Sequence, residues 1–393
     1  MMAKVAALDT FDMTSMLDLS VLGEIAEHFS FLDNVNFALL GNVFQDVAAY
    51  QFTTDTTQLV AFGGKNFSFI NGIPVSGRVT GIALTDGALS DGLEGQSLNV
   101  LITGISVGTV DIAKAVASAS KADDLALIAD MFKGNDRFDL SEGSDLAFGL
   151  AGADKMFGNG GNDLLFGGDG IDTLVGGAGD DALEGGNGAD IINGGIGSDT
   201  ASYATASTGQ TINLGVALQA NGDRLVSIEN VQGSDLADQL TAGRVGAGLS
   251  GGGGGDTLVG GLRADTLSGG TGNDVLTGGG GKDLFVFDAA PVSGNADVIT
   301  DFVRGRDKIV LSSEVFTGLD RLGTNGLDPS NFIRSTSATA TSARDANDHL
   351  IYNSTTGILF FDADGVGGKA GVAIAQIGTD LHPNLAASDI LIL

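Results

Sequence analysis

The aspartates of this sequence recur at a fixed interval, and they are the side chains best placed to do chemistry. Between residues 136 and 199 they lie nine residues apart, each with a Gly two positions before it and usually an apolar residue two positions after it. The unit is clearest at residues 167–175, which read G-G-x-G-x-D-x-U-x, where U is a large aliphatic residue. Carboxylate and carbonyl oxygens are the ligands that Ca²⁺ takes in proteins. The pattern therefore predicts a row of calcium sites rather than one catalytic centre.

Each repeat predicts a tight glycine turn followed by a three-residue strand. Gly tolerates the positive φ and the close backbone approach that such a turn requires, and only U of the strand points inward. The predicted carboxylate ligands are Asp145, Asp154, Asp163, Asp172, Asp181, Asp190 and Asp199 in a first block and Asp256, Asp265, Asp274 and Asp283 in a second. The predicted carbonyl ligands lie near Gly161, Gly168, Gly170, Gly177, Gly179, Gly186, Gly188, Gly195, Gly197, Gly254, Gly272 and Gly281.

Two repeats make one 18-residue coil, and neighbouring coils are expected to stack about 4.8 Å apart. Each ion should therefore lie between turns whose aspartates are 18 residues apart. These pairs are Asp145 with Asp163, Asp154 with Asp172, Asp163 with Asp181, Asp172 with Asp190, Asp181 with Asp199, Asp256 with Asp274, and Asp265 with Asp283. Ala247 replaces an Asp of the repeat and Arg263 replaces a Gly. We therefore expect the edge formed by Ala247 and Asp265 to bind weakly or not at all.

The composition excludes several classes of protein. The 393 residues include 63 Gly but only four Pro, which excludes collagen, and 43% are hydrophobic, which is enough to form a core. The absence of Cys excludes disulfides and thiolate metal sites. A formal net charge of −30 makes nucleic acid and anionic membrane surfaces poor partners. Neither a transmembrane helix nor a cleavable export signal is expected.

The nonapeptides resemble those of the RTX (repeats-in-toxin) calcium-binding proteins. Residues 283–309, which contain Asp297-Val298-Ile299 and Gly305-Arg306-Asp307-Lys308-Ile309, are similar to the C-terminal region of serralysin-like RTX proteins. The resemblance implies a right-handed parallel β-roll. It also implies export by a type I system that uses an uncleaved C-terminal signal, and residues 389–393 are similar to such signals.

The expected fold is all-β, a calcium-binding parallel β-roll with a mixed, mainly β N-terminal module and a β-rich C-terminal cap. The expected domains are the module at 1–130, the first roll block at 131–203, an insertion that decorates the coils at 204–235, the second block at 236–290, and the cap with the secretion signal region at 291–393. The insertion is inferred because Asp199 and Asp238 are 39 residues apart, which is not a multiple of nine. Strands are expected at 58–62, 66–70 and 98–105, and helices at 13–31, 110–119 and 124–132.

One motif in the N-terminal module has the form of a catalytic site. Gly104-Ile105-Ser106-Val107-Gly108 matches the G-x-S-x-G elbow of α/β-hydrolases. However, barely a hundred residues precede Ser106, and the only histidines after it, His349 and His382, lie in the tail. We therefore expect Ser106 to lie at a glycine-flanked strand end. No H-E-x-x-H motif or clustered histidines are present, so the chain is not expected to be an enzyme.

The sequence favours a secreted bacterial calcium-binding protein with a structural, adhesive or interaction role. Stacked aspartates repel one another without metal, so we expect the chain to fold on calcium outside the cell. The expected partners are several Ca²⁺ ions, the type I secretion machinery, and a cell-surface or extracellular-matrix component. The alternative is a secreted RTX hydrolase with its active site in residues 1–130 and Ser106 as nucleophile.

Overall fold

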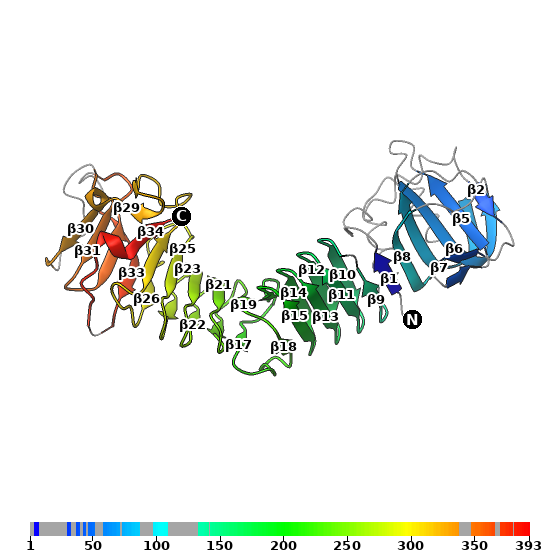
Figure 1. The fold of residues 1–393 in the computed structure, drawn as a ribbon, viewed down its shortest axis with the longest axis horizontal. Coiled ribbons are helices and arrows are strands. Elements are labelled where there is room, and N and C mark those ends of the chain that lie inside the picture. The colour runs from blue at the N-terminus through cyan, green and yellow to red at the C-terminus, as the bar shows by residue number, and fades with distance from the viewer. Residues whose placement is uncertain are drawn as a thin grey trace. The chain divides into compact units, whose positions relative to one another are not determined.

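The computed structural model describes residues 4–7, 30–32, 37–39, 42–44, 46–51, 58–70, 73–86, 97–108, 133–140, 142–337, 347–365, 370–379 and 381–393. The chain divides into two compact units, one of residues 1–199 with 222–227 and the other of residues 200–221 with 228–393. The regular structure of these described residues is β-strand, apart from the short 3-10 helices η3 (Pro329–Asn331) and η4 (Ala387–Asp389) (Figure 1). The predicted all-β class is confirmed.

The first unit begins with an antiparallel sheet. Its long strands β6 (Gln58–Ile70), β7 (Ile73–Asp86) and β8 (Ser97–Gly108) pair in chain order. The shorter strands are β2 (Ser30–Leu32) and β5 (Asp46–Gln51) at the edge, β1 (Lys4–Ala7) beside β8, and a separate hairpin of β3 (Phe37–Leu39) and β4 (Asn42–Phe44). β1 also pairs in parallel with β9 (Arg137–Asp139), which joins this sheet to the repeats.

The sequence predictions for this module meet different outcomes. The strands expected at 58–62 and 66–70 both lie within β6, and the strand expected at 98–105 lies within β8. Of the helix expected at 13–31, the last two residues belong to β2. Its other residues, and the helices expected at 110–119 and 124–132, lie outside the described residues.

The repeats of the first unit form two parallel sheets that face each other. One contains β9, β11 (Lys155–Gly160), β13 (Thr173–Ala178), β15 (Ile191–Ile196) and β18 (Arg224–Val226), and the other contains β10 (Leu146–Ala151), β12 (Leu164–Asp169) and β14 (Ala182–Asn187). Paired residues are 18 apart, as in Leu165 opposite Leu183. Both of these side chains, which occupy position U, are fully buried. The predicted parallel β-roll is therefore confirmed.

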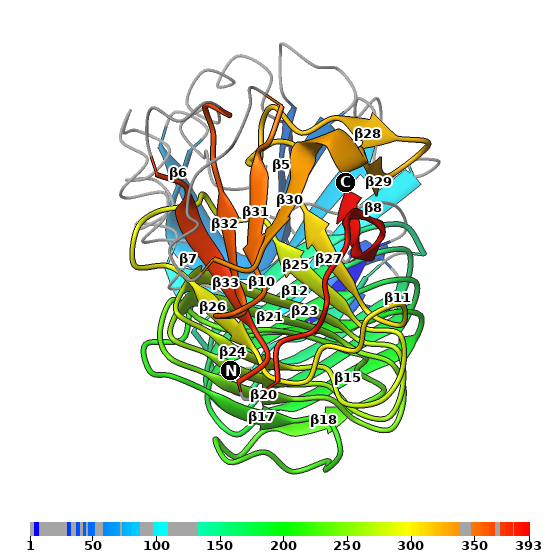
Figure 2. The same cartoon turned by 90° about the vertical axis from the view of Figure 1, so that its left-hand side faces the viewer.

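The second unit, taken by itself, has the same architecture of two facing parallel sheets (Figure 2). One sheet contains β16 (Thr200–Ser202), β19 (Asn230–Gln232), β21 (Gly248–Gly254), β23 (Thr266–Gly272), β25 (Leu284–Phe287), β27 (Lys308–Leu311) and β34 (Ile390–Ile392). The facing sheet contains β17 (Thr211–Asn213), β20 (Gln239–Thr241), β22 (Thr257–Val259), β24 (Val275–Thr277), β26 (Asp297–Ile299) and β33 (Val372–Ile377).

The C-terminal strands close the end of the second roll. β32 (Ile358–Phe361) pairs with β33, and β31 (Leu350–Asn353) and β30 (Phe332–Ser335) follow it outward. The two-residue strands β28 (Arg321–Leu322) and β29 (Gly326–Leu327) lie beside β34. The last residues of the chain thus form a strand of the sheet.

The expectation that residues 204–235 only decorate the coils is wrong. Within the second unit, β17 pairs in parallel with β20, and β19 pairs with both β16 and β21. Within the first unit, β18 pairs with β15. Ile212, Leu225 and Val231 fill the inward position of these strands and are buried. The segment supplies further rungs, and its longer turns hide them from a nine-residue count.

Candidate metal centres

The predicted aspartates lie in columns along the turn edges of the two rolls. All eleven are buried. The backbone N–H of Asp154 donates to Oδ1 of Asp172, at 2.7 Å, and the N–H of Asp172 donates to Oδ1 of Asp190, at 2.8 Å. The same bond joins Asp145 to Asp163, Asp163 to Asp181, Asp181 to Asp199, Asp256 to Asp274, and Asp265 to Asp283. Every predicted pair therefore lies on adjacent turns.

The second carboxylate oxygen, Oδ2, is buried without a hydrogen-bond donor in eight of these aspartates. They are Asp154, Asp163, Asp172, Asp181, Asp190, Asp256, Asp274 and Asp283. A buried carboxylate that lacks a partner is costly, and such groups are normally paired or coordinate a metal. The columns of partnerless oxygens therefore fit a row of cations, and calcium, a hard cation with oxygen ligands, suits this donor set.

Backbone oxygens converge on the same turns. A Cβ atom placed on Gly167 would overlap both Oδ2 of Asp172 and the carbonyl oxygen of Gly185. The predicted carbonyl groups point from one turn to the next, because a Cβ on Gly186 would strike the oxygen of Gly168 and a Cβ on Gly188 that of Gly170. In the same way, the carbonyl oxygen of one glycine lies close to the Cα of the glycine 18 residues later in the pairs Gly161 and Gly179, Gly177 and Gly195, Gly179 and Gly197, and Gly254 and Gly272. A Cβ on Gly281 would meet the carbonyl of Arg263.

The second residue of each turn divides the turns into two kinds. In the first kind it has positive φ, as at Leu150 (73°), Asn159 (75°) and Gly168 (104°), and Oδ2 of the turn's aspartate has no donor. Gly177, Gly186, Gly195, Gly252, Gly270 and Gly279 have positive φ at the same position. This backbone conformation favours glycine, which explains why the repeat places Gly there.

In the second kind the chain supplies the missing donor. The backbone N–H groups of Ser234, Gly261 and Val303 donate to Oδ2 of Asp238, Asp265 and Asp307, at 2.6, 2.6 and 2.7 Å. None of these three donor residues has positive φ. Such a self-capped turn has less need of a cation. The edge formed by Ala247 and Asp265, which we expected to bind weakly, contains one of them.

The turn that ends at Asp307, in the second roll, contains a positively charged side chain, that of Arg306. The guanidinium of Arg306 donates from Nε to Oδ1 of Asp307, at 2.9 Å, and from Nη2 to the carbonyl oxygen of Gly279, at 3.0 Å. Gly279 lies in the turn of Asp283, so the guanidinium bridges two stacked turns. A chain-borne positive charge thus interacts with a carboxylate and a carbonyl that belong to neighbouring coils.

Sequence reasoning left several members of the columns out of the predicted ligands. Asp190 donates its backbone N–H to Oδ1 of Asp223, Asp274 to Asp297, and Asp283 to Asp307. Asp136 likewise donates to Asp154. Asp223, Asp297 and Asp307 interrupt the nine-residue spacing, but each is followed two residues later by a buried aliphatic residue. A search for D-x-U without fixed spacing would have found them.

Burial alters the proton affinity of the column carboxylates. Burial is the main reason that the pKa of Asp154, Asp163 and Asp256 is raised to about 7, and the carboxylates on adjacent turns act in the same direction. The pKa values of Asp181, Asp190 and Asp283 are raised to about 6 for the same first reason, burial. The charged form of the column is thus unfavourable until something positive accompanies it.

No second centre emerges among the described residues. Ser106 lies within β8, and the surroundings of its side chain lie outside what is described. Nδ1 of His349 lies 2.8 Å from the carbonyl oxygen of Asp362, and Nδ1 of His382 lies 3.2 Å from that of Ile377. In the part of the chain that is described, no three His, Cys, Asp or Glu side chains gather as a metal cluster.

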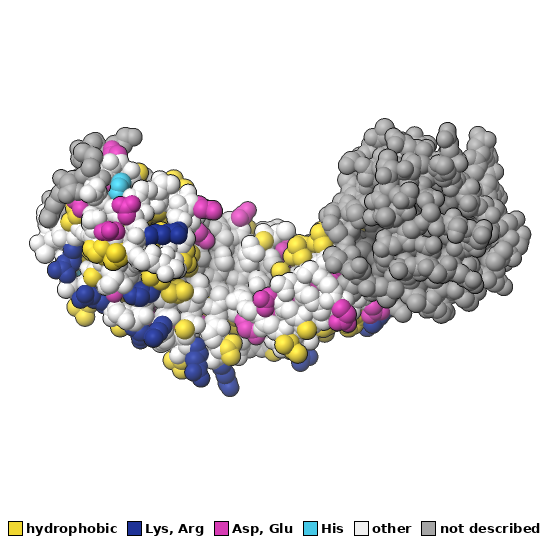
Figure 3. All heavy atoms as spheres, turned by 45° about the horizontal axis from the view of Figure 1, so that its top comes forward, with side chains coloured by type: hydrophobic (Ala, Val, Ile, Leu, Met, Phe, Trp, Pro, Cys, Tyr) yellow, Lys and Arg dark blue, Asp and Glu magenta, His cyan; other side chains and the backbone are white. Residues whose placement is uncertain are grey.

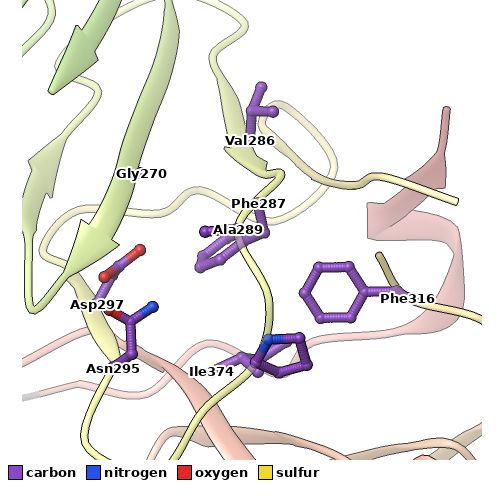
Figure 4. A pocket seen from close by; sticks show the side chains of 9 residues that line it. Gly270, Val286, Phe287, Ala289, Asn295, Asp297, Phe316 and Ile374 are labelled. Atoms are coloured by element: carbon purple, nitrogen blue, oxygen red, sulfur yellow. The ribbon is translucent and has the colours of Figure 1, made fainter. Parts of the chain in front are cut away.

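A small pocket in the second unit has an acidic wall (Figure 4). Asp297 and Asn295 face it beside the apolar side chains of Phe287, Phe316 and Ile374. Asp297 is already part of a column, so the pocket offers no independent catalytic pair. No helix of the described residues is long and apolar enough to span a membrane.

Comparison with known proteins identifies the repeats. Residues 132–165, 166–201 and 250–285 match a family model described as the RTX calcium-binding nonapeptide repeat. Among solved structures, the extracellular lipase LipA from Serratia marcescens shares 19% sequence identity over 66% of this chain, with a TM-score of 0.23. The match covers 40% of the lipase chain, so this chain spans less than half its length. No curated protein matches.

Proposed function

We propose, from the RTX calcium-binding nonapeptide repeats that this chain carries, that it is a secreted bacterial protein whose roll folds on calcium outside the cell. The observation that supports this most is the columns of buried Oδ2 atoms without a donor. Asp154, Asp163, Asp172, Asp181, Asp190, Asp256, Asp274 and Asp283 would hold the ions, together with turn carbonyls. A bound ion supplies the positive charge that the columns lack, and its binding free energy becomes folding free energy.

Far-UV circular dichroism of the full chain tests the proposal. The β signal is expected to be weak in chelator and to rise cooperatively with calcium in the range of extracellular sites, about 10⁻⁴–10⁻³ M. Isothermal titration should find several ions per chain. An identical spectrum with and without chelator, or fewer than two bound ions, would overturn it.

We propose export by a type I system through the C-terminal residues. Residues 389–393 could be recognised as a signal only before the chain folds, because Asp389, Ile390 and Ile392 are buried in the folded second unit. Low calcium in the cytosol would keep that segment accessible. Deleting residues 389–393 is expected to leave the protein inside a host that carries the secretion machinery, and export of the truncated chain would contradict the proposal.

We propose that the role outside the cell is structural, adhesive or an interaction with a surface or matrix component, rather than catalysis. This proposal also rests on the lack of an acid–base pair or metal triad in the sequence of residues 1–130. In the alternative, an esterase, Ser106 would be the nucleophile. Comparable activity of wild type and Ser106→Ala on short-chain esters is expected, at the level of the uncatalysed reaction. Activity that Ser106→Ala abolishes would establish the hydrolase alternative.

A further inference from the structure

One turn edge of the second roll gathers positive charge on a strongly acidic chain. We define the basic edge as the turns at 242–247, 260–265 and 278–283, which lead from β20, β22 and β24 into β21, β23 and β25. They contribute Arg244, Arg263 and Lys282, one cation per turn. The turns of the opposite edge, at 233–238, 251–256, 269–274 and 288–297, contain no Lys or Arg.

The cations of the basic edge are available to a partner. Arg244, Arg263 and Lys282 are exposed, and within the described part of the chain none of them has a hydrogen bond or ion pair. The next turn differs, because Arg306 is bonded to Asp307 and Arg304 to Asp389. Three neighbouring cations therefore remain unneutralised in a chain whose net charge is −30.

The three turns stack directly on one another. The backbone N–H of Ala247 donates to Oδ1 of Asp265, and that of Asp265 to Oδ1 of Asp283. A Cβ on Gly246 would lie 4.0 Å from Cβ of Arg263, and a Cβ on Gly280 would lie 3.8 Å from Cδ2 of Leu262. The basic edge is thus a stacked row with one cation per coil.

Exposed aliphatic side chains accompany the cations. Leu262, beside Arg263, is 86% exposed, and Val245, beside Arg244, is 55% exposed. Figure 3 shows Lys and Arg side chains gathered along one border of the C-terminal unit, with hydrophobic side chains among them. Most other turns place a small or polar residue at these outward positions, and the exceptions are Ile196 and Leu236, which are 78% and 43% exposed. The turns of Ile196 and Leu236 contain no Lys or Arg, whereas Leu262 and Val245 each adjoin an arginine. Their exposure points to a partner that accepts both charge and hydrocarbon.

We propose that the basic edge docks on an anionic lipid surface. Lipid headgroups offer a plane of negative charge for Arg244, Arg263 and Lys282, and the acyl boundary beneath them accepts Leu262 and Val245. A soluble polyanion would neutralise the cations but would offer no apolar environment to the side chains of Leu262 and Val245. The basic edge contains no aromatic side chain for stacking bases, so single-stranded nucleic acid fits it less well. The segregation of charge gives this edge a sign opposite to the net charge, which is the quantity from which anionic membranes were expected to be poor partners.

Vesicle co-sedimentation of the full chain, at a fixed calcium concentration that gives the folded spectrum, tests this proposal. Vesicles of phosphatidylglycerol and phosphatidylcholine are expected to bind the protein, and vesicles of phosphatidylcholine alone are not. Each cation contributes about fivefold to such binding, so the variant Arg244→Gln/Arg263→Gln/Lys282→Gln should bind about a hundredfold more weakly. The control Lys155→Gln/Arg224→Gln/Arg321→Gln removes the same charge elsewhere and should bind like wild type.

A second variant separates lipid from other anions. Val245→Ser/Leu262→Ser keeps every charge and should lose binding to the anionic vesicles while its calcium-dependent spectrum is unchanged. Equal loss in the two charge variants would mean nonspecific attraction and would overturn the proposal. So would wild-type binding to soluble polygalacturonate that matches its vesicle binding and is unaffected by Val245→Ser/Leu262→Ser, which would assign the edge to polyanions. Calcium-dependent folding without vesicle binding would also overturn it, and would leave the proposed function intact.

Discussion

At the scale of single residues, an aspartate at the sixth position of a turn does not by itself define a cation site. Asp172 and Asp265 are both buried and both accept a backbone N–H at Oδ1. They differ at Oδ2, which has no donor in Asp172 but accepts from Gly261 in Asp265. The backbone at the second turn position makes the difference, since Gly168 has positive φ and Gly261 does not.

This contrast predicts unequal effects of the same substitution. Asp172→Asn removes a negative charge that two neighbouring ion positions of the proposed row would share, so the calcium midpoint should rise several-fold and the Hill slope should fall. Asp265→Asn removes a carboxylate whose oxygens already have backbone donors, so the midpoint should change less than twofold. Calcium titrations followed by circular dichroism measure both. Equal midpoints in the two variants would show that the turns do not differ.

Arg306 predicts a contribution to stability that does not depend on metal. Its hydrogen bonds to Asp307 and to the carbonyl of Gly279 are charge-assisted, and such bonds contribute about 1.5–3 kcal/mol each. Because the side chain is one-third exposed, we expect Arg306→Gln to lower the unfolding free energy in saturating calcium by about 1–2 kcal/mol. Urea denaturation measures it, with Arg321→Gln as the exposed control. Equal stability of the two variants would assign the contacts no energetic role.

At the scale of elements, each rung is a strand of three to seven residues, longer in most of the first roll than the three residues expected from the repeat, and it buries one large side chain between two sheets. Leu165, Leu174 and Leu183 succeed one another in this position and are all fully buried. One short strand buries little surface, so a rung is stable only between its neighbours.

The rungs predict a large difference between two nearby substitutions. Leu174→Ala leaves a cavity in the roll, so it should destabilise the calcium-bound protein by about 2–5 kcal/mol. Ile171→Ala, three residues earlier, changes a side chain that is 64% exposed and should stay within about 0.5 kcal/mol of wild type. Urea denaturation in saturating calcium compares them. A Leu174→Ala loss as small as that of Ile171→Ala would show that the rung core is not tightly packed.

The sequence predicted the roll because its elements repeat in one phase. A fixed nine-residue interval determines which residue of each strand points inward, and Leu165 opposite Leu183 has the register that it predicts. The nine-residue pattern did not predict the rungs of residues 204–235, because Asp223 follows a turn of different length. The hydrogen bond from Gly261 to Oδ2 of Asp265 could not be predicted for another reason. Gly adopts positive or negative φ with similar ease, so its identity does not reveal which the chain selects.

At the scale of the whole molecule, charge is sorted by position. The acidic side chains that repeat at nine residues are drawn inward to the turn columns, and the described cations of residues 236–310 lie on or beside one edge. A chain with a net charge of −30 therefore presents surfaces of both signs. The charged form of the column carboxylates is unfavourable, because these groups are buried and stacked on one another.

This cost predicts how pH acts on the metal-free protein. Burial raises the folded-state pKa of Asp154, Asp163 and Asp256 to about 7, whereas an unfolded Asp titrates near 3.9. Between these values the folded roll binds more protons than the unfolded chain, so its stability falls as pH rises through this window. In chelator, the β signal should therefore be stronger at about pH 5 than at about pH 8, with protons replacing calcium in the columns.

Calcium should act in the opposite direction, because it competes with those protons for the same oxygens. The calcium concentration needed for half-maximal binding is expected to rise as pH falls from about 7 to about 5, even while the metal-free fold becomes more stable. Calorimetric titrations at the two pH values, paired with circular dichroism in chelator, measure both trends on one sample. If the β signal in chelator rose with pH, the column carboxylates would be stabilised as anions without metal, and the role assigned to their partnerless oxygens would be wrong.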